Sequence, residues 1–206
     1  MRRAIFGGSF DPVHNGHVSL VSELQKVLEL DEIIVMPTGI SPFKKDMERR
    51  PASGADRLEM CRLAFSDMPF VTVSGHEISR KGVSYTVDTV RHFRGLYPDD
   101  KLFWLVGGDM LKSFDRWKSW REILSMCTLA AVSRQKCGSD REELEKKAAE
   151  LRKYGEVVFA ETEPLEISST EIREKIIKNS DISCYVPQNV VKYILERGLY
   201  NRHSEL

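Results

Sequence analysis

The chain has 206 residues, of which 31 are Lys or Arg and 31 are Asp or Glu, so its formal net charge at neutral pH is zero. This length allows one sizeable hydrophobic core, and the lack of a basic excess argues against a general nucleic-acid binder. The four cysteines show no C-x-x-C spacing, which favours reduced thiols over a zinc site or a redox pair. The apolar run after Arg3 stops at Gly7, too short for a signal peptide or a membrane span, so we expect a cytoplasmic protein.

The first predicted elements are a short buried strand at residues 4–6 and an amphipathic helix that begins near Gly16. Apolar side chains recur along this helix at helical spacing: Val18, Leu20, Val21, Leu24, Val27 and Leu28. In the turn between strand and helix, Gly7 and Gly8 can take positive φ and let another group approach the backbone closely. The helix start offers unpaired N–H groups and a partial positive charge, so the turn suits an anion.

Two histidines, His14 and His17, stand three residues apart at the entrance to this helix, a spacing that lets both imidazoles point at one object. Imidazole N–H groups donate hydrogen bonds to phosphate oxygens and can carry positive charge near neutral pH. The turn has neither the Gly-Lys-Ser/Thr of a P-loop nor the glycine spacing of the dinucleotide fingerprint. A zinc site is a weaker alternative because no third ligand is evident, and an imidazole that merely caps the turn is another.

The rest of the chain alternates between apolar runs and helical patterns. Strands are predicted at residues 32–37, 70–74, 101–106, 128–132 and 157–160. Helices are predicted from Ser53 to Phe65, from Val87 to Leu96, and over residues 109–114, 120–126, 139–154, 170–179 and 187–197, where Gly198 can act as the stop. Residues 38–51 are expected to form a loop with a largely solvated charge run.

This alternation indicates an α/β fold, a doubly wound (Rossmann-like) parallel sheet with helices on both faces and a small helical C-terminal part. We expect a single domain over residues 1–206, with 168–200 as the helical subregion. Gly7-Gly8 and Gly107-Gly108 both end predicted strands. Ligands of open parallel sheets bind outside the carboxyl ends of the strands, so these two glycine pairs should lie close together.

A second candidate anion site lies near the C-terminus, in the segment Ile167–Arg173. Ser168 and Glu171 have capping-box spacing, which would leave the N–H groups of Ser169 and Thr170 free at a helix N-terminus. Arg173 lies in the next turn and can grip phosphate oxygens with its fork of donors. Taken alone, the segment also fits an ordinary capped helix with a solvated arginine.

The two segments together resemble the signatures of the nucleotidyltransferase superfamily, (H/T)xGH in GGSFDPVHNGH and ISSTxxR in ISSTEIR. The resemblance implies catalytic roles for His14, His17 and Arg173, with His17 at the α-phosphate of ATP and Arg173, Ser169 and Thr170 at the β- and γ-phosphates. It extends the ATP-binding set to Gly8, Ser9, Phe10, Lys44, Gly107 and Asp109. It also implies Mg²⁺ bound through the ATP phosphates, with no protein metal site. No covalent nucleophile is expected, because positioning and electrostatic stabilisation supply most of this catalysis.

Further stretches resemble the bacterial nicotinate-nucleotide adenylyltransferases: MPTGISPFK (36–44), GVSYTVDTV (82–90), VGGDML (106–111), FDRWKSW (114–120) and YVPQNVVKYILERGLY (185–200). That resemblance implies transfer of the adenylyl group of ATP to nicotinate mononucleotide, giving deamido-NAD and pyrophosphate in NAD biosynthesis. Ser84, Tyr85, Thr86 and Trp117 would line the pyridine pocket with an aromatic ring stacked on the nicotinate, and Asp109 would contact the adenosine ribose. A tryptophan at a helix boundary also commonly serves packing, and Gly-Gly-Asp is often just a turn.

The chain departs from that family at two places. Ser41-Pro42-Phe43-Lys44 replaces Pro-Pro-His-Lys, so only Lys44 can be carried over as a phosphate contact, and Arg134-Gln135-Lys136 replaces Arg-Pro-Gly on the adenine side. The expected partners are ATP and nicotinate mononucleotide, without nucleic acid or membrane, and the oligomeric state is not indicated. Alternatives are transfer to nicotinamide mononucleotide or phosphopantetheine, and a nucleotide sensor that binds without turnover.

Overall fold

The structure, a computed structural model, describes residues 1–40, 52–80, 82–134, 139–163 and 165–201 of the protein. Strands and helices alternate along the chain. The strands are β1 (Arg2–Gly8), β2 (Glu32–Pro37), β3 (Val71–Val73), β4 (Lys101–Gly107), β5 (Thr128–Arg134) and β6 (Val157–Thr162). The helices are α1 (Asn15–Val27), α2 (Gly54–Ala64), α3 (His76–Ser79), α4 (Thr86–Leu96), α5 (Gly108–Lys112), the 3-10 turn η1 (Phe114–Arg116), α6 (Trp120–Met126), α7 (Ser139–Leu151), α8 (Ser169–Ile177) and α9 (Gln188–Glu196).

The strands form a six-stranded sheet in the order β3-β2-β1-β4-β5-β6, and every neighbouring pair is parallel. Along β1 the register with β2 runs from Arg3 opposite Glu32 to Gly8 opposite Pro37. The direction of winding reverses between β1 and β4, where a crevice opens at the carboxyl ends of the strands. The predicted doubly wound, Rossmann-like sheet is confirmed.

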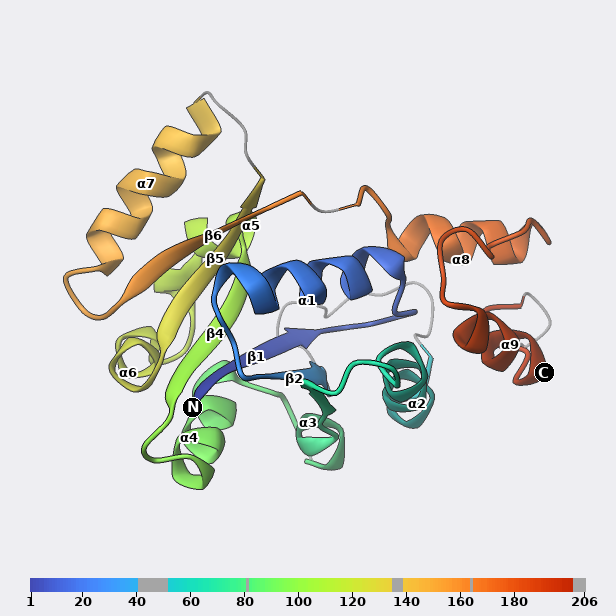
Figure 1. Ribbon diagram of the computed structural model, residues 1–206, viewed down its shortest axis with the longest axis horizontal. Coiled ribbons are helices and arrows are strands. Elements are labelled where there is room, and N and C mark those ends of the chain that lie inside the picture. The colour runs from blue at the N-terminus through green and yellow to red at the C-terminus, as the bar shows by residue number, and fades with distance from the viewer. Residues whose placement is uncertain (41–51, 81, 135–138, 164, 202–206) are drawn as a thin grey trace.

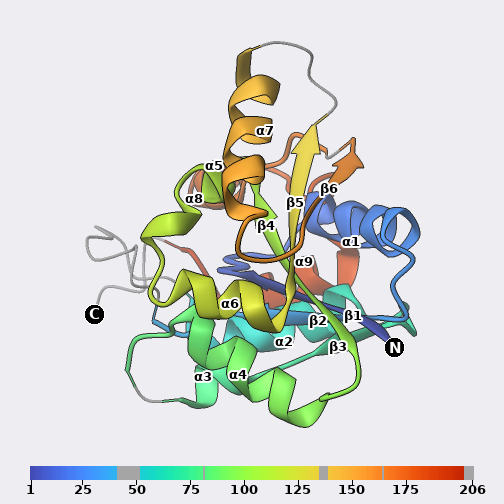
Figure 2. The ribbon, with the colours of Figure 1, turned by 90° about the vertical axis from the view of Figure 1, so that its left-hand side faces the viewer.

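Both faces of the sheet are covered, because the strands are apolar on successive residues and each face needs a helical layer. Ala4 and Val35 point into one core with side chains of α1, α2, α8 and α9, whereas Ile5 and Ile34 point into the other with side chains of α4, α6 and α7. Figure 2 shows α4 and α6 next to each other, with α1 on the opposite side of the sheet. The helices on both faces follow the prediction.

The C-terminal helices share a core with the sheet. Their buried residues Ile172 and Ile176 of α8 and Val190 and Ile194 of α9 belong to the core that contains Val21 of α1. Figure 1 shows α8 and α9 together at one end of the molecule, on the side toward which β1 runs. The C-terminal helices therefore lie beside the turn that follows β1.

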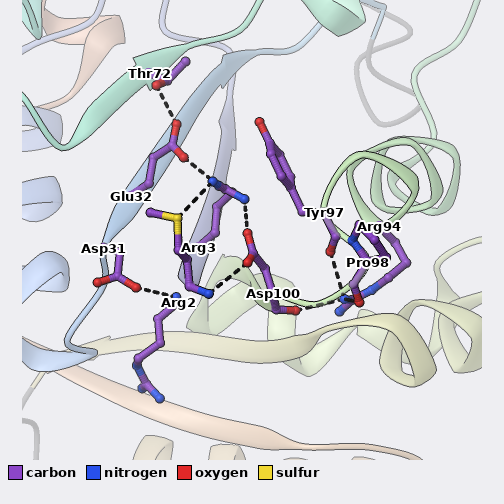
Figure 3. A network of polar contacts seen from close by, with 10 residues as sticks. Arg2, Arg3, Asp31, Glu32, Thr72, Arg94, Tyr97, Pro98 and Asp100 are labelled. Carbon is purple, nitrogen blue, oxygen red and sulfur yellow. Dashed lines mark hydrogen bonds and ion pairs between the residues drawn. The ribbon is translucent and has the colours of Figure 1, made fainter.

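At the opposite, amino ends of the strands a buried arginine ties three elements together (Figure 3). Arg3 of β1 is 6% exposed, donates to Glu32 of β2 over 2.6 Å, and pairs with Asp100, which precedes β4. Its guanidinium carbon lies 3.4 Å from the centre of the Tyr97 ring, a cation–π contact. A buried charge is tolerated only with such partners, so this end is a structural anchor, remote from the strands' carboxyl ends.

Several local predictions agree with the structure, and a few element bounds differ. Ser53 caps α2 by accepting from the Asp56 backbone N–H at 3.1 Å, and Gly198 follows α9 with φ +60°. The third strand is shorter than predicted, at Val71–Val73, and the charged helix α7 ends at Leu151. The one-turn helix α3 was not predicted, because four residues are too few to show a helical repeat.

Candidate active site at the sheet switch point

The two glycine pairs singled out in the sequence meet at the switch point. Gly8 ends β1, Gly107 ends β4, and these strands are neighbours in the sheet. Gly7 and Gly107 line one cavity. The expectation that the two carboxyl ends lie close together is therefore confirmed, and the turns that follow them face a common space.

The turn between β1 and α1 is built differently from the prediction. Gly7 and Gly8 keep ordinary φ values, and the left-handed residue of the turn is Phe10, with φ 47°. A Cβ on Gly8 would lie 3.0 Å from the Phe10 ring, so Gly8 is needed for close packing. Phe10 is only 2% exposed and packs edge-on against the His17 ring, with centroids 5.0 Å apart. The predicted ATP-binding residue Phe10 thus supports His17 from the core.

The two histidines do lie together, in contact with each other. His14 is the N-cap residue of α1 and His17 lies in its first turn, and their rings stack with centroids 3.7 Å apart. The backbone N–H of His14 donates to Nδ1 of His17 at 3.2 Å. This hydrogen bond assigns the proton of neutral His17 to Nε2, which leaves one N–H donor for a ligand. The imidazole of His17 is therefore set in one tautomer by the backbone.

Burial changes the charge state expected from the sequence. Desolvation lowers the pKa of His14 to about 4. Desolvation and then the nearby His14 lower the pKa of His17 to about 3. Both imidazoles are neutral at pH 7 in the free protein, although an unperturbed imidazole can carry positive charge near neutral pH. They act on an approaching anion as hydrogen-bond donors.

The second predicted segment docks on the first. Ser169 Oγ donates to the carbonyl of Pro12 at 2.9 Å, and Arg173 Nη1 donates to the carbonyl of Asp11 at 2.6 Å. Arg173 Nη2 also donates to Oγ1 of Thr170 at 3.1 Å. Residues separated by about 160 positions thus meet at the N-termini of α1 and α8.

Two of the helix-end N–H groups expected to be free are already used. The Thr170 N–H donates to Ser168 Oγ at 3.2 Å, so Ser168 caps α8 through that residue instead of Glu171. The Asn15 N–H at the start of α1 donates to the carbonyl of Tyr185 at 2.8 Å. Because other contacts already occupy these two backbone N–H groups, side chains supply a larger share of the donors for an anion than the sequence suggested.

A cavity of 520 Å³ opens beside this turn at the switch point. Its walls come from the ends of β1 and β4, the segment after β2, α3, the segment before α4, and the segment around η1. The lining residues are Phe6, Gly7, Thr38, Glu77, Ser84, Tyr85, Thr86, Trp104, Leu105, Val106, Gly107, Met110, Arg116, Trp117 and Lys118. All four residues predicted to bind the pyridine ring are in this set, so the fold brings residues 84–86 and Trp117 to one cavity.

The predicted pyridine residues present both polar and aromatic groups to the cavity. Ser84 is 8% exposed, and its Oγ has no hydrogen-bond partner among the described residues. Trp117 packs against Phe114, with ring centroids 5.1 Å apart. Lys118 Nζ lies 4.2 Å from the centre of the Tyr85 ring. An unsatisfied buried hydroxyl next to aromatic faces suits a flat ligand with polar substituents.

Sequence reasoning missed four polar lining residues, Thr38, Glu77, Arg116 and Lys118. Arg116 and Lys118 flank Trp117, and that adjacency is the signal that could have found them. Glu77 carried no such signal, because only the fold brings α3 to the cavity. Its carboxylate is 4% exposed and accepts from Thr89 Oγ1 at 2.8 Å.

The remaining predicted residues lie outside the cavity lining or outside the described part of the chain. Asp109 is exposed in the first turn of α5, outside the cavity lining, while its carbonyl accepts from Ser113 Oγ at 3.4 Å. The carbonyl of Ser9 accepts from Arg57 Nη1 at 2.8 Å. Lys44, Phe43, Gln135 and Lys136 lie outside the described residues.

Within the described ranges no group of three or more His, Cys, Asp or Glu is placed to hold a metal.

Comparison with known proteins connects this geometry to a family. The cytidylyltransferase-like family matches residues 5–175. A Clostridium botulinum (strain Kyoto / Type A2) protein named probable nicotinate-nucleotide adenylyltransferase is 36% identical over 201 residues, 97% of this chain and 99% of its own. The chain belongs to the cytidylyltransferase-like family, among the nicotinate-nucleotide adenylyltransferases. A Dehalococcoides mccartyi protein of the same name is 37% identical over 204 residues, 98% of each chain. The resemblance noted in the sequence is confirmed.

Solved structures of this family show the same fold. The nicotinic acid mononucleotide adenylyltransferase of Plasmodium falciparum in complex with NaAD matches with a TM-score of 0.75 and 20% identity, covering 97% of both chains. The same enzyme complexed with APC matches with a TM-score of 0.74 and 19% identity, over 97% of this chain and 96% of that one. None of the helices in the described part of the chain is long and apolar enough to cross a membrane.

Proposed function

We propose that this member of the family transfers the adenylyl group of ATP to nicotinate mononucleotide, forming deamido-NAD and pyrophosphate in NAD biosynthesis. The observation that carries the proposal is the docking of α8 on the β1–α1 turn, through Arg173 to Asp11 and Ser169 to Pro12. This docking brings Arg173 and the start of α8 onto the turn that leads to His14 and His17, and Gly7, at the other end of that turn, lines the 520 Å³ cavity. A polyphosphate would lie along the turn, and the pyridine nucleotide would fill the cavity.

The reaction is an in-line displacement at the α-phosphorus of ATP. A 5′-phosphate oxygen of nicotinate mononucleotide forms the new P–O bond, and the bond to the β-phosphate oxygen breaks as pyrophosphate leaves. His17, with its proton on Nε2, donates to a nonbridging oxygen of the α-phosphate, where negative charge grows in the transition state. His14 lies against it and binds the triphosphate. Arg173 and the N-terminus of α8 hold the departing phosphates.

On the acceptor side, the cavity supplies shape and a polar end. Trp117 presents an aromatic face for stacking on the pyridine ring, and Ser84 Oγ offers a buried hydroxyl without a described partner. Lys118 and Arg116 bring positive charge to the lining, which favours an anionic nucleotide with a ring carboxylate. Mg²⁺, carried in on the ATP phosphates, would neutralise charge on the leaving group. We place this reaction in the cytoplasm, since Cys61, Cys127 and Cys184 are free thiols.

An acceptor screen tests the proposal. The purified protein is incubated with ATP, Mg²⁺ and one of nicotinate mononucleotide, nicotinamide mononucleotide or phosphopantetheine, and both adenylylated product and pyrophosphate are quantified. We expect the highest kcat/KM with nicotinate mononucleotide. A higher kcat/KM with the amide would reject the acid as substrate. Absence of pyrophosphate release with all three acceptors would instead support a nucleotide sensor.

A further inference from the structure

The aspartate of the phosphate-binding turn is buried and held by the C-terminal end of the chain. Asp11 is 3% exposed, and its Oδ1 accepts from the Tyr200 hydroxyl at 2.8 Å and from the Ala52 N–H at 3.0 Å. Burial and the neighbouring Asp11 carboxylate raise the pKa of Tyr200 above its usual range, so the phenol stays protonated and donates. A residue near the C-terminus thus orients a side chain at the start of the first helix.

The same aspartate faces the arginine that is proposed to bind phosphate. Arg173 Nη1 donates to the Asp11 carbonyl at 2.6 Å and lies 3.9 Å from Oδ2 of its carboxylate. Oδ2 has no hydrogen-bond partner within the described part of the chain, so its charge is left to interact with Arg173. The contacts form a chain from Tyr200 through Asp11 to Arg173.

The backbone is strained at both ends of the Tyr200 contact. Phe10, immediately before Asp11, has φ 47°, and Tyr200 has φ 66°. Left-handed conformations are unfavourable for bulky side chains and persist only where surrounding contacts enforce them, and they are enriched at functional sites. The hydrogen bond joins two segments that each adopt such a conformation, which indicates that it positions the turn.

We infer that Asp11 and Tyr200 are positioning residues of the transfer reaction: the Tyr200 hydroxyl orients the Asp11 carboxylate, and Asp11 holds Arg173 in place to bind the β- and γ-phosphates. This inference rests on the proposed function of Arg173. Neither residue needs to touch the substrates. If Tyr200 is lost, Arg173 keeps its charge but samples more orientations, so polyphosphate binding weakens while the pyridine cavity is unchanged.

The chain offers a matched control for a merely structural role. The hydroxyl of Tyr193 in α9 donates to Asp56 Oδ1 at 2.9 Å, so it makes the same type of bond from the same end of the chain. Asp56 lies in α2, and neither partner contacts the β1–α1 turn in the hydrogen bonds described. Tyr193→Phe therefore removes a phenol–aspartate hydrogen bond without touching Asp11 or Arg173.

The experiment compares the full-length wild type with Tyr200→Phe and Tyr193→Phe in unfolding temperature, steady-state kinetics for both substrates, and pyrophosphate affinity by calorimetry. We expect Tyr200→Phe to lower kcat/KM for ATP and to weaken pyrophosphate binding about tenfold, with KM for nicotinate mononucleotide within about twofold of wild type. Tyr193→Phe should leave kcat/KM for ATP, KM for nicotinate mononucleotide and pyrophosphate affinity near wild type, even where its unfolding temperature falls.

A double-mutant cycle with Arg173→Ala tests whether Tyr200 affects pyrophosphate binding through Arg173. In the Arg173→Ala background, Tyr200→Phe is expected to weaken pyrophosphate binding no further, because its effect passes through Arg173. Additive losses would overturn the inference, as would Tyr200→Phe behaving like Tyr193→Phe. Pyrophosphate binding is measured without turnover. If the wild type forms no dinucleotide, the proposed reaction is rejected, and the pyrophosphate affinities of the variants still test this inference.

Discussion

The stacked pair of His14 and His17 makes the stability of the free protein depend on pH. Their folded pKa values, about 4 and about 3, lie below the ordinary histidine value of 6.5 that the unfolded chain retains. Between those values the unfolded chain binds more protons than the folded one, so protonation favours unfolding. The stabilisation is fully present above a pH of about 6.5 and is lost as the pH falls toward the folded values.

The size of the effect follows from linkage. Each such histidine lowers the unfolding free energy by about 1.4 kcal/mol per pH unit in this range. From about pH 7.5 to about pH 5 this amounts to about 2 kcal/mol for each ring and about 4 kcal/mol for the pair, a large part of a typical domain's stability. His17→Gln should remove about half of the pair's contribution to the pH dependence, because glutamine does not titrate and can still accept the His14 N–H from the first turn.

The assay is reversible urea unfolding followed by circular dichroism, with wild type and His17→Gln measured without nucleotide at both pH values. Carboxylates titrate in both proteins alike, so the difference between the two pH-dependent losses isolates His17. We expect wild type to lose about 2 kcal/mol more than the variant on acidification. Equal losses would show that His17 is not a buried neutral imidazole, and the reasoning would fail.

Three further predictions concern the site. His17→Ala should lower kcat about a hundredfold or more while the fold is retained by circular dichroism, and a change confined to KM would contradict transition-state donation. Trp117→Ala should raise KM for nicotinate mononucleotide about tenfold in steady-state assays, and an equally large fall in kcat at unchanged KM would speak against stacking. In Gly39→Ala the new Cβ would lie 2.5 Å from the Glu77 carbonyl oxygen and 2.8 Å from Ser84 Oγ. We expect the unfolding free energy, measured by denaturant titration, to fall by about 2 kcal/mol. An unchanged unfolding free energy would refute the close packing of Gly39 against Glu77 and Ser84.

The pattern of apolar residues and motifs in the sequence was enough to predict the architecture and much of the location of the site. Apolar runs such as residues 32–37 must be buried on both faces, so six runs separated by helical patterns specify one parallel sheet with a helical layer on each face. The carboxyl ends of β1 and β4 are neighbours in the sheet, and the two signature segments do come together, through Arg173 on Asp11 and Ser169 on Pro12.

Only the tertiary structure decided which polar atoms meet and what charge they carry. The bond between Tyr200 and Asp11 joins residues 189 positions apart, and the left-handed φ falls on Phe10 although two glycines precede it. The neutral state of His17 likewise arises from desolvation by surrounding side chains. Hydrophobic periodicity is a property of each segment by itself, whereas hydrogen-bond partners, backbone strain and pKa values depend on neighbours that become adjacent only when the whole chain has folded.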